Sequence, residues 1–403
     1  SKNIRRSRRQ LIYITTATFL CQHFFGFILN PLVLTRLAGN AGQCGQRICI
    51  IRSLALNVKA FFEHWIVNGR CDVIKGGGGF VAVLCFYMIP CLNTFVFGLW
   101  YTGGIFLMKR SFIMMELFDD VAIVFEGGGM RSTYTGAMAA VMLERGMKFP
   151  FVAGVSAGTT IAVNFVLRDV SRLHDSFVGI ASDPKVMGMK QLMKGNGYFN
   201  SHYLYEEAFF DRDLENGMWE RFSESDVEIA IGAFNQMTGE VHYWHRADIS
   251  SYNNLCRICR ASSSLPMMMP PTFIDGVGYV DGGMRECFAL RPALEAGYKR
   301  LVVLPTHMRG YRREPSKELP LAKVLCRDTP EVIEAFRLRA DRYNAQMALL
   351  EEMEASGQAL VIYPDEMPLT RTSSDPEELE AAWEMGLAQG RAQVDDWLAW
   401  LRG

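Results

Sequence analysis

Ser156 stands in a short motif that is typical of a catalytic nucleophile. It lies between Gly154 and Gly158, after an apolar stretch with the length of a buried strand and before an apolar helical stretch. Glycines at these two positions remove side chains that would clash with a sharply bent backbone, and the turn exposes the serine hydroxyl at the start of a helix. The structural alternative is a tight turn without chemistry, because Gly-x-Ser-x-Gly is a short motif.

A run of glycines follows an earlier apolar stretch, residues 121–125, and continues into a basic residue. Its members are Gly127, Gly128, Gly129, Met130 and Arg131. Backbone N–H groups without neighbouring side chains suit a carbonyl oxygen that becomes an oxyanion. A phosphate-binding loop would need Gly-Lys-Ser/Thr at its end, and a dinucleotide site would need a glycine where Ser132 stands. An oxyanion loop and a simple strand-to-helix turn both remain open at this point.

Asp281 is followed by Gly282 and Gly283 at the end of a predicted strand pair, residues 272–280, that turns at Asp275 and Gly276. A carboxylate there can accept the proton of a serine when a dry site raises its basicity. Asp-Gly-Gly alone is also a common turn. A different base is conceivable, because His307 follows Asp281 and a strand, which permits a triad of Ser156, Asp281 and His307.

The elements that must position these residues alternate between short apolar strands and helices. Strands are expected at 121–125, 149–153, 227–234, 240–244 and 301–304, and helices at 132–145, 159–167 and 255–262. This alternation is typical of a layered α/β domain. Beyond Pro330 we expect a long amphipathic helix, a strand at 359–363 and two helices after Pro376.

The three motifs, in this order, resemble the patatin-like phospholipase family over roughly residues 118–310. The resemblance implies a three-layer α/β/α sheet in a catalytic domain at 115–315, with a mainly helical C-terminal elaboration at 316–403 that is similar to that of bacterial members. It implies a Ser156–Asp281 dyad, an oxyanion hole from the glycine loop, no cofactor, and hydrolysis of acyl esters in lipids, as in phospholipase A-like enzymes and esterases. Arg131 would then either orient the oxyanion loop or pair with an anionic lipid head group. One departure is Ser132, where many relatives have glycine. An acyltransferase using the same acyl-enzyme and an inactive membrane-tethered scaffold are the competing hypotheses.

Residues 1–114 differ in composition from the rest of the chain. They carry 13 Lys and Arg against only Glu63 and Asp72, and a run from Gly76 to Met108 contains no charge over 33 residues. A helix of that length would cross a bilayer, and a second apolar run at 11–34 is a weaker candidate. The segment is expected to be either a membrane-associated region or a non-native extension.

The remaining signals indicate structure rather than a second site. The ten cysteines have neither metal-ligand spacing nor the density of a disulfide scaffold, so we expect no metal and a reducing compartment. Cys256 and Cys259 fall within a helix, and the basic cluster 309–313 lacks the aromatic residues of a nucleic-acid site. The expected partners are therefore a lipid substrate and a membrane surface, without nucleic acid, in a bacterial protein of the cytoplasm or the membrane periphery.

Overall fold

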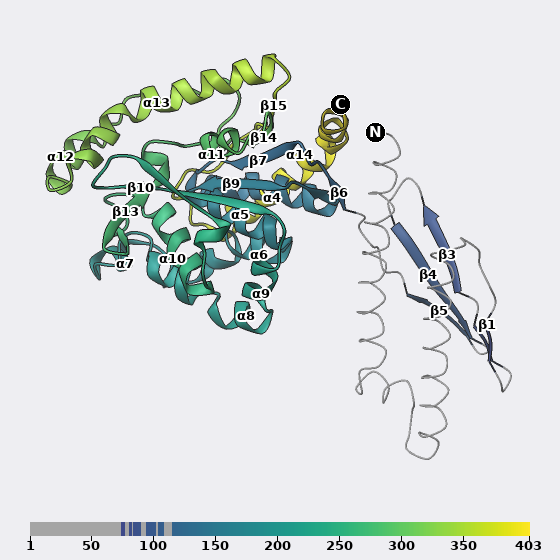
Figure 1. Cartoon of the computed structure of the whole chain (residues 1–403). Helices are drawn as coiled ribbons and strands as arrows, with labels where there is room; N and C mark the ends of the chain where they lie inside the picture. The colour runs from purple at the N-terminus through teal and green to yellow at the C-terminus, as the bar shows by residue number, and fades with distance from the viewer. Residues whose placement is uncertain (1–73, 77–79, 83, 90–93, 102–103, 109–114) are drawn as a thin grey trace. The chain divides into compact units, whose positions relative to one another are not determined.

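The computed structural model describes residues 115–403 without a break and, before them, only 74–76, 80–82, 84–89, 94–101 and 104–108. Contacts divide the chain into two units, Ser1–Met114 and Met115–Gly403, and each is described here by itself (Figure 1).

The described part of the first unit consists of strands. The short pair β1 (Ile74–Gly76) and β2 (Phe80–Ala82) is antiparallel, and so are β3 (Leu84–Ile89), β4 (Thr94–Tyr101) and β5 (Gly104–Met108). The expectation that the uncharged run forms one membrane-crossing helix is therefore wrong for these residues. They are rich in Phe, Tyr, Trp, Val and Ile, and such side chains favour strands. Within the described ranges no helix combines the length and apolarity needed to cross a bilayer. The run at 11–34 lies outside those ranges.

The second unit is built on an eight-stranded sheet. Its strands are β7 (Val121–Phe125), β9 (Phe151–Val155), β10 (Glu228–Asn235), β11 (Val241–His245), β12 (Thr272–Ile274), β13 (Val277–Asp281), β14 (Arg300–Leu304) and β15 (Ala359–Val361). The spatial order is β12-β13-β10-β9-β7-β14-β15, and β11 pairs with β10. Five strands run parallel to one another, in the order β10, β9, β7, β14 and β15. Strands β11 and β13 run antiparallel to β10. A separate parallel pair joins β6 (Glu116–Leu117) to β8 (Met147–Lys148).

Helices cover both faces of this sheet, as Figure 1 shows. Successive residues of β7 point to opposite sides: Ile123 belongs to one hydrophobic core, whereas Ala122 and Val124 belong to another. The first core includes α4 (Ser132–Glu144), α5 (Ala157–Leu167) and α10 (Tyr252–Ser263). The second includes α11 (Leu290–Glu295) and α13 (Pro330–Ala355). Burial of both faces explains why the parallel strands are apolar throughout, and the predicted α/β/α layering is confirmed.

A helical insertion that the sequence analysis did not identify lies between α5 and β10. Its helices are α6 (Val170–Asp175), α7 (Met189–Met193), α8 (Phe210–Glu215) and α9 (Met218–Ser223). They have five or six residues each, too few for a clear amphipathic period, which explains why the sequence pattern missed them.

The C-terminal region is integrated into the same unit. After α12 (Leu319–Leu325) and α13, β15 extends the sheet beside β14, and α14 (Pro376–Arg402) packs against α4. The expectation of two helices after Pro376 is wrong, because α14 is one helix of 27 residues. Its internal glycines do not break it but permit close packing: a Cβ on Gly386 would lie 2.4 Å from the carbonyl oxygen of Tyr134 on α4.

Candidate active site

Ser156 lies at the sharp turn between β9, which ends at Val155, and α5, which begins at Ala157. Its backbone has φ 54° and ψ −135°. Residues other than glycine rarely adopt such a conformation, and it is the arrangement by which a strand-to-helix turn exposes a nucleophile. The half-buried side chain lines a large cavity.

The glycines near Ser156 allow main chains to touch. A Cβ on Gly158 would lie 2.4 Å from the carbonyl oxygen of Phe125, at the end of β7. A Cβ on Gly127 would lie 2.6 Å from the Cβ of Ser156. Both distances are shorter than van der Waals contact. The glycine run and the serine motif can therefore pack against each other only because both positions lack a side chain.

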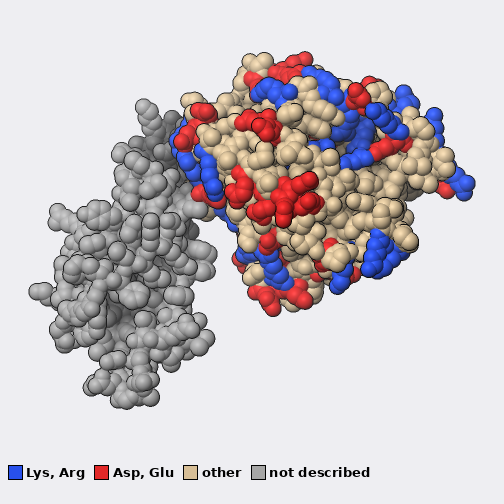
Figure 2. Space-filling view, turned by 180° about the vertical axis from the view of Figure 1, so that it is seen from behind, with Lys and Arg blue, Asp and Glu red and all other residues tan. Residues whose placement is uncertain are grey.

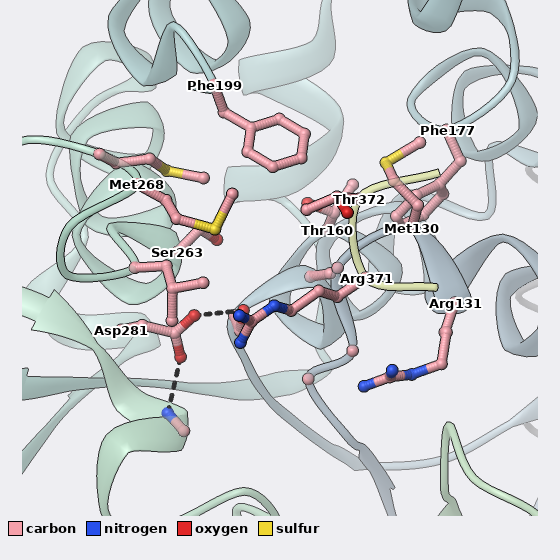
Figure 3. Close-up of a pocket in the computed structure, with 18 of the residues that line it drawn as sticks. Met130, Arg131, Thr160, Phe177, Phe199, Ser263, Met268, Asp281, Arg371 and Thr372 are labelled. Atoms are coloured by element: carbon pink, nitrogen blue, oxygen red, sulfur yellow. Dashed lines mark hydrogen bonds between the residues drawn. The ribbon is translucent and has the colours of Figure 1, made fainter. Parts of the chain in front are cut away.

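Strand β10 brings Ser156 and Asp281 together. Along one edge of β10, Gly232 pairs with Val155 of β9, and the next residue, Ala233, pairs with Asp281 of β13. The ends of β9 and β13 therefore meet on the same strand, since β11 occupies the other edge at these residues. The Ser156 hydroxyl donates a hydrogen bond of 2.6 Å to Asp281 Oδ2, one of the two dashed bonds drawn from Asp281 in Figure 3.

Asp281 is held in a dry environment. It is 4% exposed, and its second oxygen, Oδ1, accepts a 2.7 Å hydrogen bond from the Gly283 N–H. Burial raises the pKa of Asp281 above its ordinary value, although the Ser156 hydrogen bond and nearby arginines oppose that rise. A carboxylate in this state accepts a proton more readily than one in water.

Ser262 stabilises the turn at Ser156, and the sequence analysis did not identify it. It is fully buried on α10, and its Oγ accepts from the Ser156 N–H at 2.9 Å and donates to the Gly232 carbonyl at 2.6 Å. Its hydroxyl thus links the turn to β10. A lone serine inside a helix offers no signal in one sequence that would reveal this role.

The glycine loop lines the same cavity as Ser156. The N–H of Gly127 donates to the Cys287 carbonyl, and that of Met130 donates to the Arg371 carbonyl. In the predicted oxyanion loop, the backbone N–H groups of Gly128 and Gly129 have no acceptor among the described residues. These two N–H groups are therefore available to a ligand in the cavity. The departure at Ser132 is accommodated because that residue begins α4 with φ −65°, which needs no glycine.

Glu126, at the end of β7, is buried beneath the loop. Its carboxylate accepts hydrogen bonds from the N–H and hydroxyl of Thr306, at 2.5 and 3.1 Å. Burial raises the pKa of Glu126, against the attraction of Arg313 and Arg131. This residue ties the loop to the end of β14.

His307 lies near the loop but outside the Ser156–Asp281 pair. It stacks on Tyr311 with ring centroids 3.6 Å apart, and burial lowers its pKa to about 3. Its buried Nε2 has no hydrogen-bond partner among the described residues. The structure therefore brings Ser156 and Asp281 into contact and does not insert His307 between them.

The cavity at this site has a volume of about 740 Å³. Its apolar part comes mainly from the insertion and from the segment after α10, where Met268 and Met269 lie, as expected from the methionine run. In Figure 3, Phe199 and Phe177 lie in the upper part of the view and Arg131 lies at the lower right. One end of the cavity suits a hydrocarbon chain and the other suits a polar or charged group.

The structure tests two further expectations from the sequence, one for a pair of cysteines and one for a basic cluster. Cys256 and Cys259 lie buried within α10, as predicted. The basic cluster 309–313 is not simply a solvated loop, because Arg313 is partly buried and lines the cavity. Within residues 115–403 and the described strands before them, no group of three or more His, Cys, Asp or Glu side chains is arranged to hold a metal.

The fold and the site define an α/β protein with a serine–carboxylate pair at a strand-to-helix turn. Residues 123–294 match the family model described as patatin-like phospholipase, and this domain of the chain belongs to that family. The family is one of lipid hydrolases in general. Residues 329–402 match a second model, described as a domain of unknown function (DUF6363).

Two curated relatives match part of the chain. "Uncharacterized protein YjjU" of Escherichia coli K12 is 23% identical over 188 residues, which cover 46% of this chain and 52% of the relative. "Lysophospholipase NTE1" of Yarrowia lipolytica is 25% identical over 168 residues, which cover 40% of this chain and 11% of the relative. The match thus spans about half of the first relative and about a tenth of the second.

Two solved structures are similar to this chain at low identity and low TM-score. VipD from Legionella pneumophila has a TM-score of 0.40 at 13% identity, covering 78% of this chain and 70% of VipD. Human GIVD cytosolic phospholipase A2 has a TM-score of 0.35 at 12% identity, covering 73% of this chain and 60% of the human one.

Proposed function

We propose that this chain hydrolyses acyl esters of lipids, with Ser156 as the nucleophile and Asp281 as its base. The observation that carries the proposal is the 2.6 Å hydrogen bond from the serine hydroxyl to a buried carboxylate, at the wall of a cavity with an apolar end. The patatin-like phospholipase match supports a lipid as the substrate.

The first half of the proposed reaction forms an acyl-enzyme. The Ser156 oxygen attacks the ester carbonyl carbon as its proton passes to Asp281. The carbonyl oxygen becomes an oxyanion and accepts hydrogen bonds from the amides of Gly128 and Gly129. When the intermediate collapses, the carbon–oxygen bond to the alcohol breaks, and the leaving alcohol takes the proton from Asp281.

The second half releases the fatty acid. Water attacks the acyl carbon and gives a proton to Asp281, and the same two amides stabilise the new oxyanion. Collapse breaks the bond to Ser156, whose oxygen recovers the proton. The raised pKa of Asp281 supports both steps, since the carboxylate must receive a proton and return it in each.

A lipid surface is the proposed source of the substrate. Helices α7 and α12 each follow a segment that lines the cavity, and both carry exposed apolar side chains. These are Met189, Leu192 and Met193 on α7, and Leu321, Val324 and Leu325 on α12. Lys190 and Lys323 lie on the same two helices. On the face of the molecule that Figure 2 draws, basic and acidic side chains are separated by uncharged surface. Apolar side chains with nearby lysines suit an anionic bilayer surface.

The proposal is tested with the full chain and a soluble 4-nitrophenyl ester. We expect Ser156→Ala and Asp281→Asn to lower kcat/KM by about 10³-fold or more, and His307→Ala to change it by less than about threefold. A fluorophosphonate probe should label the wild-type protein and not the Ser156→Ala variant. Asp275→Asn, an exposed carboxylate on the same hairpin as Asp281, is the matched control and should behave as wild type.

Two outcomes would contradict this mechanism. Ester turnover that survives in purified Ser156→Ala would exclude that serine as nucleophile. A large loss in His307→Ala would instead favour a triad. Product analysis with added glycerol separates hydrolysis from acyl transfer, since a transferase would form the glycerol ester in place of free fatty acid.

A further inference from the structure

Residues 329–402, the part of the chain that matches the domain of unknown function, contact the surroundings of Ser156 at three points. Two of the contacts come from α13, and one comes from the segment between β15 and α14. We call this part the 329–402 region. It lies outside the patatin-like match, which ends at residue 294, so that match assigns it no role.

The first contact is made by Arg339 of α13, on the segment that follows Asp281. Arg339 Nε donates a 3.3 Å hydrogen bond to the carbonyl of Gly283. The N–H of the same glycine donates to Asp281 Oδ1 at 2.7 Å, which is one of the dashed bonds in Figure 3. Arg339 is partly buried and lines the cavity. Because Gly283 lies between the two side chains, a shift of Arg339 would move the donor that orients the Asp281 carboxylate.

The positive charge of Arg339 also acts on Asp281. Burial raises the pKa of Asp281, whereas the Ser156 hydrogen bond and the attraction of Arg339 oppose that rise. Other ionisable groups act on the same carboxylate from neighbouring segments, namely Arg313, the Cys287 thiol and the Tyr205 phenol. Burial raises the pKa of both the thiol and the phenol, so neither is charged at neutral pH. Arg339 is therefore a permanent charge that stabilises the ionised form of Asp281.

The second contact is made by Gln346, two turns further along α13. Its Oε1 accepts from the N–H of Cys287 at 3.0 Å and from that of Phe288 at 3.4 Å. Its Nε2 donates to the Phe288 carbonyl at 3.1 Å. The Cys287 carbonyl in turn accepts from the N–H of Gly127 at 3.4 Å. Gln346 therefore holds the residue to which the first glycine of the loop is bonded.

The third contact is the main chain at Arg371, between β15 and α14. Its carbonyl accepts from the Met130 N–H at 3.1 Å. A Cβ on Gly129, which has φ 58°, would lie 2.4 Å from the same carbonyl oxygen. The Arg371 side chain pairs with Glu318, which holds this segment in place. The N–H groups at both ends of the glycine loop, those of Gly127 and Met130, are thus anchored, and the two between them have no acceptor among the described residues.

We propose that the 329–402 region positions both the base and the oxyanion loop of the proposed active site. Arg339 orients the base and stabilises its charged form. Gln346 and the main chain of Arg371 fix the two ends of the glycine loop, so that its two free N–H groups keep their direction. Donors that are fixed in advance stabilise an oxyanion because they need no rearrangement during the reaction. The inference rests on the proposed function and adds the role of a region to which none is assigned.

The role of Arg339 is tested by the pH profile of kcat/KM for 4-nitrophenyl butyrate with the full chain. Loss of the positive charge in Arg339→Gln raises the pKa of Asp281, so the carboxylate becomes protonated at a higher pH. We expect the midpoint of the acid limb to shift to higher pH in Arg339→Gln. The midpoint should stay at its wild-type position in Arg339→Lys, which keeps the charge. A purely structural role would lower the rate without moving the midpoint.

The matched control for Arg339 is another arginine of α13. Arg337 is exposed and pairs with Glu334. The Arg337→Gln variant should therefore keep the wild-type acid limb. If Arg339→Gln does not fold, Arg339→Met, which keeps a long unbranched stem without the charge, carries the same expectation.

The role of Gln346 is tested by separating kcat from KM. We expect Gln346→Ala to lower kcat by about tenfold or more and to change KM by less than about threefold, because the oxyanion is absent from the bound ester. The rate of labelling by a fluorophosphonate probe should fall by a similar factor. Gln346→Glu keeps an acceptor for the two N–H groups and should recover part of the loss.

The matched control for Gln346 is an exposed glutamine of the same region. The side chain of Gln358 accepts a hydrogen bond from Ser356, and Gln358→Ala should behave as wild type. Thermal unfolding shows whether each variant folds. If Gln346→Ala does not fold, Gln346→Met, which keeps the length of the side chain without the amide, carries the same expectation.

Each outcome has a distinct meaning. Acid limbs that coincide in wild type and in folded Arg339→Gln would overturn the role of Arg339. A wild-type kcat and labelling rate in folded Gln346→Ala would overturn the role of Gln346. A wild-type chain that neither hydrolyses the ester nor reacts with the fluorophosphonate would instead count against the proposed hydrolase function itself.

Discussion

At the residue scale, the proposed chemistry depends on a carboxylate that burial makes more basic. Asp281 combines a short hydrogen bond to Ser156 with a position that is 4% exposed. His307, which is also titratable and close by, has its pKa lowered to about 3 and is neutral at ordinary pH. The two groups therefore predict different pH profiles for catalysis.

We expect kcat/KM for a neutral soluble ester to fall on the acid side with a midpoint above 3.8, the ordinary value for aspartate. The sign follows because the raised pKa of Asp281 means that the carboxylate becomes protonated, and loses its function as a base, at a higher pH than usual. The pH profile of wild type and of His307→Ala should show the same acid limb. An acid limb that disappears in His307→Ala would identify the histidine as the titrating base.

At the scale of elements, short helices next to the cavity provide apolar side chains for its lining and for the surface beside it. The insertion between α5 and β10 supplies apolar lining, and α7 and α12 expose apolar side chains beside the cavity. Exposed apolar side chains are favourable when they contact a bilayer, and they are unfavourable when they contact only water.

We expect the double variant Met193→Asp with Val324→Asp to bind anionic phosphatidylglycerol-containing vesicles at least about fivefold more weakly, because each change places a negative charge at the lipid surface. Its kcat/KM on a soluble ester should stay within about twofold of wild type. Vesicle flotation and ester turnover measure the two effects. Leu214→Asp, at a 71% exposed position on α8 that does not line the cavity, is the matched control. Equal vesicle binding by wild type and the double variant would remove α7 and α12 from the docking surface.

At the scale of the whole molecule, all described lining residues of the cavity lie between Gly127 and Thr372. They belong to the second unit, which has its own two-sided sheet and cores on both faces. A unit that buries its own core is expected to fold by itself.

We expect residues 115–403 expressed alone to unfold in one cooperative transition and to retain kcat/KM on a soluble ester within about twofold of the full chain. Circular dichroism and ester turnover check the two parts. Vesicle partition of both proteins then measures the contribution of residues 1–114 to membrane association. A shortened protein that is folded but inactive would show that the first unit contributes to catalysis.

Several features follow from local sequence alone. Apolar runs located β7, β9 and β14, and the hairpins β10–β11 and β12–β13 were predicted close to their observed bounds. The order of the glycine loop, Ser156 and Asp281 indicated the family, and the family match covers all three. Short-range rules suffice here because backbone conformation at a glycine turn or in a buried strand is decided by neighbouring residues.

Other features depend on contacts between distant segments. The meeting of Val155 and Asp281 along β10 and the hydrogen bond from the Ser156 N–H to Ser262 join residues far apart in the chain. Arg313 and Arg339 line the same cavity from distant segments and form no ion pair among the described residues. The single helix α14 likewise depends on its packing against α4. A single sequence contains no record of strand register or of which buried charges lack a partner, because both arise only when separate elements pack together. The sequence by itself therefore determined the candidate reacting groups and their local turns, and the tertiary structure decided their convergence and the charge of the cavity around them.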